Sequence, residues 1–383
     1  MLKKLITECV FAKRQYSAEA KKIGILGIPF SKGQPKKGVT NGPDAIRKGG
    51  LVEQLSQFYN KSLIKDYGDL DYPLLKEIGT VENMKSYEEV MSCNKELSKK
   101  VQEIVADNRV CLNLGGDHAI AIGSIDGHLK AKKDICVIYV DAHCDINTNK
   151  TSGSGNIHGM PVSIVTKEMC EYWQDLPGME WQEPTLSVRN IAYIGLRSVD
   201  PYERVFVDKF GIAAFSMAEI EECGIHTVIN MALKAIDPEQ NRSIHVSFDI
   251  DALDPNDAPC TSITIPGGLT VREGIHILER IHDTGRLNVM DIVELNPDIG
   301  TERDAQKTVG VAIQLLAAAC GFKRGGIRPK DATLPLQNNQ NKNTNSYIFF
   351  YFMRIATFLF YERYIAYDAI STSPRLLNVS HLW

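Results

Sequence analysis

The sequence predicts an α/β fold in which a doubly wound, mostly parallel β-sheet is flanked by helices. Short apolar runs rich in Val and Ile recur along the chain, stretches with helical periodicity separate them, and polar residues gather where the runs end. Alternation of strand and helix is typical of α/β domains, and ligands of such domains bind beyond the carboxyl ends of the strands.

Six runs are apolar on both faces, as expected for strands buried in a parallel sheet. In chain order they read KIGILGIPF, VCLNLGG, ICVIYVDAH, NIAYIGLR, SIHVSFDID and LNVMDIVELNP. Three helices have predicted ends. The first, at 86–107, opens with Ser86 and Glu89 in capping-box spacing, and the second opens in the same way with Thr270 and Glu273. The third runs from about 304 to 320 and stops at Gly321.

The composition is that of an ordinary globular protein, with 383 residues, 44% of them hydrophobic, and a formal net charge of −4. Because the sequence has no basic excess and no Lys/Arg-rich stripe, we do not expect a nucleic-acid partner. The nine Cys stand singly, without a CxxC pair, which indicates reduced thiols in an intracellular compartment.

Both ends differ in composition from residues 21–325, which we expect to form the folded domain. Residues 1–20 are basic, with apolar residues at roughly helical spacing, and resemble a mitochondrial transit peptide; a disordered cytosolic extension is the alternative. Residues 326–383 contain an Asn/Gln-rich segment and an aromatic run at 347–361 that is shorter than the ~20 apolar residues of a membrane span. We expect this tail to lie outside the fold and to form no membrane span, with a surface-associating helix as the alternative.

Acids and histidines follow four of the predicted strands, in the segments GGDH, VDAHCD, FDID and IVELNP. Asp141, His143 and Asp145 alternate after one strand, and Asp249 and Asp251 alternate after another. Alternate residues of an extended chain point the same way, so each set can converge on one site.

Four buried Asp side chains would repel one another, and two divalent cations would neutralise them. The alternative is that some of these residues cap turns or helices, as single Asp residues often do. Carboxylates combined with imidazole favour Mn²⁺, with Fe²⁺, Co²⁺ and Ni²⁺ as other candidates. Cys144 lies on the opposite face of the strand from its neighbours, and we interpret it as a packing residue. Two metals that share a water lower its pKa from ~15.7 toward neutrality, which supplies hydroxide for attack on an sp² carbon.

Six segments resemble the arginase family, in order and across roughly residues 21–325. They read GGDHAIAIGS, VDAHCDIN, SGNIHGMP, GLRSVDP, SFDIDALDP and IVELNP, and IPFSKGQPKKGVTNGPDAIRKGG near the start is also similar to arginases. The resemblance implies an arginase–deacetylase type α/β fold, a catalytic domain at 21–325, two Mn²⁺ per subunit and often a homotrimer. It also implies hydrolysis of L-arginine to L-ornithine and urea by a metal-bridging hydroxide.

The resemblance assigns six residues to the metals. His118 and Asp145 would bind the first metal, His143 and Asp251 would bind the second, and Asp141 and Asp249 would bridge the two.

Two further residues would be catalytic. Glu294 would hold the guanidinium group, for which a bidentate carboxylate is a good partner; the alternative is a surface acid. His158 would move protons to the leaving amine, because its unperturbed pKa of ~6.5 suits that task. The alternative for His158 is a loop histidine bonded to the backbone.

The resemblance places Asn147 and Ser154, with Asn156 beside them, at the carboxylate end of the substrate, and Asp200 at its α-amino group. These contacts would separate arginine from its decarboxylated form, so arginase is favoured over agmatinase. Another guanidino hydrolase such as agmatinase, or a metal-binding pseudoenzyme, remains an alternative. A zinc deacetylase of the same fold would not need four Asp together with Glu294.

The sequence departs from the family's pattern in three places, and the first is Thr261-Ser262-Ile263-Thr264, where arginases usually read TGTP. Ile263 replaces a Thr near the guanidinium group, so that a polar wall of the site becomes apolar. Ser198 stands where vertebrate-like members carry an Asp, and Cys144 stands where a Thr is usual. Ile263 is the departure with the largest expected effect on substrate affinity or choice.

Overall fold

The computed structural model describes residues 21–75, 78–173 and 176–325, so the predicted transit peptide and tail lie outside the described residues. Eight strands form one sheet in the order β2-β1-β3-β8-β7-β4-β5-β6, and every neighbouring pair is parallel. The predicted fold class is therefore confirmed. The strands are β1 (Lys22–Gly27), β2 (Ile64–Asp69), β3 (Arg109–Leu114), β4 (Ile135–Val140), β5 (Ile191–Leu196), β6 (Ala213–Ser216), β7 (Ser243–Asp249) and β8 (Leu287–Val293).

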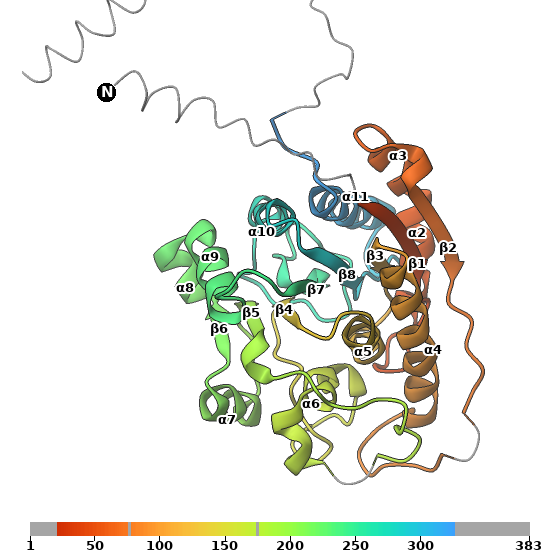
Figure 1. The fold of residues 1–383 in the computed structure, drawn as a ribbon, viewed down its shortest axis with the longest axis vertical. Coiled ribbons are helices and arrows are strands. Elements are labelled where there is room, and N and C mark those ends of the chain that lie inside the picture. Colours follow the sequence, from red (N-terminus) through yellow and green to blue (C-terminus); the bar gives the residue numbers. More distant parts are fainter. Residues whose placement is uncertain (1–20, 76–77, 174–175, 326–383) are drawn as a thin grey trace, which may run out of the picture. The chain divides into compact units, whose positions relative to one another are not determined.

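Helices cover both faces of the sheet, and each face has its own hydrophobic core (Figure 1). One face packs against α2 (Gly42–Lys48), α3 (Leu51–Ser56), α8 (Met217–Cys223), α9 (Ile225–Ile236), α10 (Val271–Asp283) and α11 (Glu302–Ala319). The other packs against α4 (Tyr87–Ala106), α5 (Ala121–Ala131), α6 (Pro161–Val165) and α7 (Pro201–Phe210). Residues alternate between the two cores along each central strand, because successive side chains of a strand point to opposite faces.

All six predicted strands are present, and the two that sequence reasoning missed, β2 and β6, are the edge strands of the sheet. Most residues of β2 are exposed or half-buried, and one of the four residues of β6 is buried. A strand that is partly exposed lacks the continuous apolar run that marks a central strand, so the sequence signal is weak.

The three predicted helices form, but their ends differ in detail. Ser86 precedes α4 with a φ of 52°, and its side chain makes no capping hydrogen bond, so the predicted capping box there is wrong. A capping residue needs an extended backbone, which Ser86 lacks. Thr270 and Glu273 do form the predicted box at α10, and α11 begins at Glu302 because Thr301 caps it.

The topology brings four site-bearing strands side by side. β3, β8, β7 and β4 are consecutive in the sheet and parallel, so their carboxyl ends meet at one edge. The acids and histidines singled out in the sequence follow these four strands. Among the described residues, no helix is both long enough and apolar enough to cross a membrane.

The last described residues pack on the domain. Phe322 lies against Phe58, with ring centroids 5.5 Å apart, and Arg324 forms an ion pair of 2.7 Å with Glu279. These contacts hold the segment after α11 against the domain as far as Arg324.

We predict that truncation after Gly325 leaves the Tm within about 2 °C of the full chain, because all the contacts that shape the described domain are retained. Truncation after Cys320 is the control. It removes Phe322 and Arg324 and should lower the Tm by at least about 4 °C, since losing a packed aromatic side chain costs a few kcal/mol. Failure of the Gly325 truncation to fold, with the full chain folding normally, would contradict the expectation that the tail lies outside the fold.

Candidate active site

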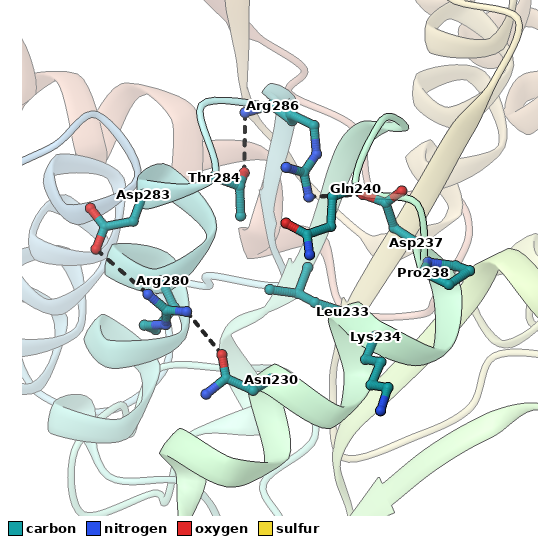
Figure 2. A pocket seen from close by; sticks show the side chains of 10 residues that line it. All are labelled: Asn230, Leu233, Lys234, Asp237, Pro238, Gln240, Arg280, Asp283, Thr284 and Arg286. Atoms are coloured by element: carbon teal, nitrogen blue, oxygen red, sulfur yellow. Dashed lines mark hydrogen bonds and ion pairs between the residues drawn. The ribbon is translucent and has the colours of Figure 1, made fainter. Parts of the chain in front are cut away.

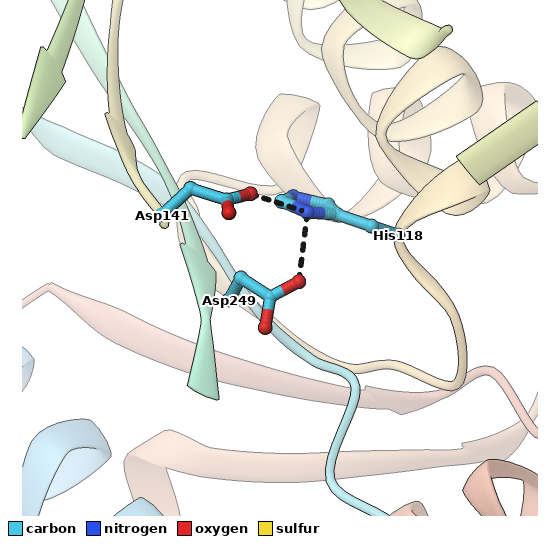
Figure 3. Close-up of side chains that lie close together, drawn as sticks. All are labelled: His118, Asp141 and Asp249. Atoms are coloured by element: carbon cyan, nitrogen blue, oxygen red, sulfur yellow. Dashed lines mark ion pairs between the residues drawn. The ribbon is translucent and has the colours of Figure 1, made fainter. Parts of the chain in front are cut away.

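Four of the six predicted metal ligands meet around one imidazole nitrogen. His118 Nδ1 lies 3.0 Å from Asp141 Oδ2, 3.1 Å from Asp145 Oδ2 and 3.2 Å from Asp249 Oδ2. Figure 3 shows the His118 ring facing Asp141 and Asp249. The histidine follows β3, Asp141 and Asp145 follow β4, and Asp249 is the last residue of β7, so the group depends on the order of strands in the sheet.

The other two predicted ligands form a second group that shares Asp141 with the first. His143 Nδ1 lies 3.3 Å from Asp141 Oδ1 and 3.2 Å from Asp251 Oδ2. The two oxygens of Asp141 thus face two different imidazoles, as a bridging carboxylate would. Asp249 directs Oδ2 toward His118, while its Oδ1 accepts the backbone N–H of Asp251 at 2.8 Å. The bridging role of Asp249 stays a prediction.

The electrostatics of the cluster favour bound cations. Burial raises the pKa of Asp141 and of Asp249, and the negative charge of Asp251 raises both further. Burial alone would also raise the pKa of Asp145, but its contact with His118 lowers it. His118 Nδ1 and Asp141 Oδ2 are buried without a hydrogen bond of normal geometry, which leaves donor atoms available to a metal.

Glu294 follows β8, and the two oxygens of its carboxylate differ: one is hydrogen-bonded and the other has no hydrogen-bond partner. Its Oε1 accepts the backbone N–H of His118 at 3.0 Å and lies 3.2 Å from His158 Nδ1. Its Oε2 is buried and has no hydrogen-bond partner. The backbone of Glu294 has a φ of 61°, an unusual value for a non-glycine residue and one found more often at functional sites. Glu294 is therefore not a surface acid.

His158 is tied to Glu294 by a side-chain contact, while its backbone N–H donates to the carbonyl of Gly33. Burial alone would lower the pKa of His158, but the bond to Glu294 and the charges of Asp145 and Asp117 raise it to about 9. The contact with Glu294 therefore favours the protonated form of the imidazole.

A cavity of about 370 Å³ opens onto this cluster. Several predicted site residues line it: His143, Asp145, Asn147, Ser154, His158, Asp200, Asp249, Asp251 and Glu294. Asn147 donates to Asp200 Oδ2 at 3.0 Å, so these two predicted substrate contacts are coupled. Asn156 is outside the lining; its backbone N–H donates to Ser154 Oγ at 3.2 Å.

The two departures from the family's pattern that face this cavity are Ser198 and Ile263, and Ile263 is 40% exposed. Cys144, the third departure, is fully buried in the core against α4–α7, in agreement with its interpretation as a packing residue.

Tyr139 and Glu203 contact predicted site residues, and sequence reasoning missed both. Tyr139 lies in the apolar run of β4, stacks on His118 with ring centroids 4.6 Å apart, and donates to Asp145 Oδ2 at 2.8 Å. Glu203 lines the cavity and accepts the backbone N–H of Asp200 and of Ile146. Burial and the charge of Asp145 raise the pKa of Glu203 to about 8. The available signal for Glu203 was the capping-box spacing Asp200-x-x-Glu203.

A second cavity, of about 350 Å³, lies at the opposite ends of the strands, beside the amino ends of β7 and β8 (Figure 2). Its arginines are engaged by neighbours: Arg286 pairs with Asp237 at 2.8 Å, and Arg280 donates to Asn230 at 2.9 Å. It contains none of the residues predicted for the site, so the candidate active site is the cavity at the carboxyl edge.

The Arginase family model matches residues 21–321. The chain belongs to the arginase family. It is 44% identical to arginase-1 of Homo sapiens over 321 residues, which are 83% of this chain and 99% of that protein. It is 41% identical to mitochondrial arginase-2 of Mus musculus over 339 residues, 88% of this chain and 94% of that protein. Its fold matches the crystal structure of arginase from Bacillus subtilis with a TM-score of 0.69 and 35% identity, covering 79% of this chain and 99% of that one.

Membership of the arginase family implies a binuclear metal site. The two side-chain groups that share Asp141 offer imidazole nitrogens and carboxylate oxygens, which are suitable ligands for divalent cations. The donor set and the buried atoms without partners fit two metal ions at this position.

We predict that Asp141→Asn loses at least one of the two metal equivalents and nearly all activity, because one carboxylate serves both groups. Metal content per chain, measured by mass spectrometry after dialysis, checks this. Asp134→Asn is the control, since Asp134 is an exposed acid at the other end of β4 that pairs with Arg242. Two full equivalents retained in Asp141→Asn would refute the shared-ligand arrangement.

Proposed function

We propose that this chain hydrolyses L-arginine to L-ornithine and urea with two Mn²⁺ ions held by the six strand-end ligands. The observation that carries the proposal is the free Oε2 of Glu294, which lies in the same cavity as the metal-binding cluster. A buried carboxylate oxygen without a partner is a good acceptor for a planar cation with several N–H donors, which is what a guanidinium group is.

His118 and His143 would each hold one metal together with the surrounding carboxylates. Mn²⁺ is preferred because four carboxylates outnumber the two imidazoles. When bound, the two cations neutralise the cluster and supply a hydroxide nucleophile at neutral pH.

The protein's own residues then orient the substrate and move one proton. Glu294 binds the guanidinium group through Oε2 while its Oε1 stays fixed by the His118 backbone. His158, whose pKa is raised by its bond to Glu294, donates a proton to the amine that leaves as the C–N bond breaks. As the C–N bond breaks, the carbon keeps the oxygen of the added hydroxide as the carbonyl of urea, and the proton of that hydroxide passes to solvent. Ornithine departs as a neutral amine and is then protonated by solvent.

The outer part of the cavity suits an amino acid. Asp200 offers a carboxylate for the α-amino group, and Asn147 and Ser154 offer hydrogen bonds for the α-carboxylate. This arrangement favours arginine over agmatine, which lacks the carboxylate.

Two further properties belong to the proposal. The chain would assemble as a homotrimer, as the family resemblance implies. It would be directed to mitochondria by residues 1–20, a reading that the similarity to a mitochondrial arginase-2 supports; a cytoplasmic location is the alternative.

The direct test measures urea release from arginine and from agmatine with added Mn²⁺ and with metal-stripped protein. We expect turnover of arginine that depends on Mn²⁺ and exceeds turnover of agmatine. Preference for agmatine would identify a different guanidino hydrolase, and metal binding without turnover of either compound would identify a pseudoenzyme.

We also predict that Ile263→Thr raises kcat/KM for arginine by roughly ten- to a hundredfold. A guanidinium N–H that becomes buried against Ile263 when the substrate fills the cavity would lack a partner, which costs ~1–3 kcal/mol for a buried polar group, and each ~1.4 kcal/mol changes a rate or affinity tenfold. Ile263→Val, which keeps an apolar wall, is the control and should give no gain. Equal values for wild type and Ile263→Thr at matched metal content would show that Ile263 does not face the guanidinium group.

A further inference from the structure

A buried string of polar side chains runs from the candidate metal centre into the sheet. His118 Nε2 lies 2.8 Å from Ser247 Oγ on β7, and Ser247 Oγ lies 3.4 Å from Asp291 Oδ2 on the neighbouring strand β8. All three side chains are at least 99% buried. Water therefore does not satisfy these groups, and their polar atoms depend on one another.

Asp291 is the acceptor at the centre of this string. Its Oδ1 accepts from Asn113 at 2.7 Å and from Ser124 at 2.6 Å, and its Oδ2 lies 2.9 Å from His245 Nε2. Burial alone would raise the pKa of Asp291, but contact with His245 and these hydrogen bonds lower it. The group is therefore an ionised carboxylate, which has no proton to donate.

The charge of Asp291 fixes the direction of the neighbouring hydrogen bonds. Ser247 can only donate its hydroxyl proton to a carboxylate, so its lone pairs are left to accept a proton from His118 Nε2. An imidazole that carries its proton on Nε2 presents the Nδ1 lone pair toward the carboxylate cluster. Tyr139 stacks on the His118 ring at an interplanar angle of 12°, which limits rotation of the imidazole.

We propose that Asp291 is a positioning residue that acts through Ser247 to fix the tautomer and orientation of His118, and so sets the metal affinity of the His118 group. This inference rests on the metal-binding part of the proposed function. Partners beyond the direct ligands commonly change metal affinity by about ten- to a hundredfold when they are removed.

The same strand provides a matched control. Ser243 lies on the same face of β7 as Ser247, four residues earlier, because every second residue of a strand shares a face. Its hydroxyl lies 2.7 Å from His128 Nε2 and accepts from Asn288 at 2.6 Å, so it is hydrogen-bonded without touching His118. Ser243 is half-buried and Ser247 is fully buried, so Ser243→Ala controls for the loss of a hydrogen-bonded hydroxyl from this face of β7.

The test measures the affinity for Mn²⁺ by titration, with free Mn²⁺ followed by electron paramagnetic resonance. His143→Ala isolates the His118 group, and His118→Ala isolates the other. In the His143→Ala background, Ser247→Ala should weaken Mn²⁺ binding by about ten- to a hundredfold. Ser247→Thr, which keeps a hydroxyl, should bind Mn²⁺ as tightly as that background does. Ser243→Ala should change the affinity by less than about threefold. In the His118→Ala background, Ser247→Ala should have no effect.

Asp291→Asn provides a second, independent variant. Its amide would donate to Ser247, which would turn the Ser247 hydroxyl toward His118 Nε2 and move the imidazole proton to Nδ1. We expect weaker Mn²⁺ binding in the His143→Ala background than Ser247→Ala produces. If Asp291→Asn does not fold, the serine variants decide alone.

Equal effects of Ser247→Ala and Ser243→Ala, or no effect of Ser247→Ala, would overturn the inference while leaving the proposed function intact. If the wild-type chain binds no Mn²⁺, the metal-dependent function itself is overturned, so the two failures are distinguishable.

Discussion

Mutual repulsion among buried carboxylates is the constraint on which the rest of the site depends. Asp141, Asp145, Asp249 and Asp251 converge at one edge of the sheet, and burial and their neighbours' charges raise the pKa values of Asp141 and Asp249. Such a cluster persists only where positive charge offsets it. Histidines from two loops, a carboxylate that contacts both of them and a cavity beside the cluster are all consistent with two cations as that charge. The parallel order of β3, β8, β7 and β4 brings the carboxylates together, so the chemistry of the site depends on the sheet topology.

The site is held by unusual backbone conformations on a rigid support. Asp145 and Glu294 both have positive φ, at 51° and 61°, which costs free energy at non-glycine residues. Both follow buried strands, and both have side chains fixed by neighbours: Tyr139 donates to Asp145, and the His118 backbone donates to Glu294. The two hydrophobic cores on either face of the sheet supply the stability that offsets this strain. The same packing buries the polar string that runs from His118 through Ser247 to Asp291, so water does not compete for the hydrogen bonds of Asp291.

Much of this arrangement can be predicted from the sequence, because its signals are local. Asp-x-His-x-Asp directly after an apolar run places three side chains on one site, and the structure brings Asp141, His143 and Asp145 into the cluster. The edge strands β2 and β6 escape prediction because their exposed faces break the apolar pattern. The sequence also does not single out three residues inside central strands: Tyr139, Ser247 and Asp291. Their runs have the apolar pattern of ordinary buried strands, and their roles depend on contacts between strands. The left-handed backbone at Ser86 is likewise invisible in a capping pattern that looks complete.

Anomalous X-ray diffraction from crystals grown with Mn²⁺, recorded on both sides of the manganese absorption edge, would show directly whether paired cations lie in the carboxylate cluster. We predict two manganese peaks per chain, one beside His118 and one beside His143, with the carboxylate of Asp141 between them. A single peak, or two peaks away from Asp141, would contradict the claim that paired cations hold the carboxylate cluster together.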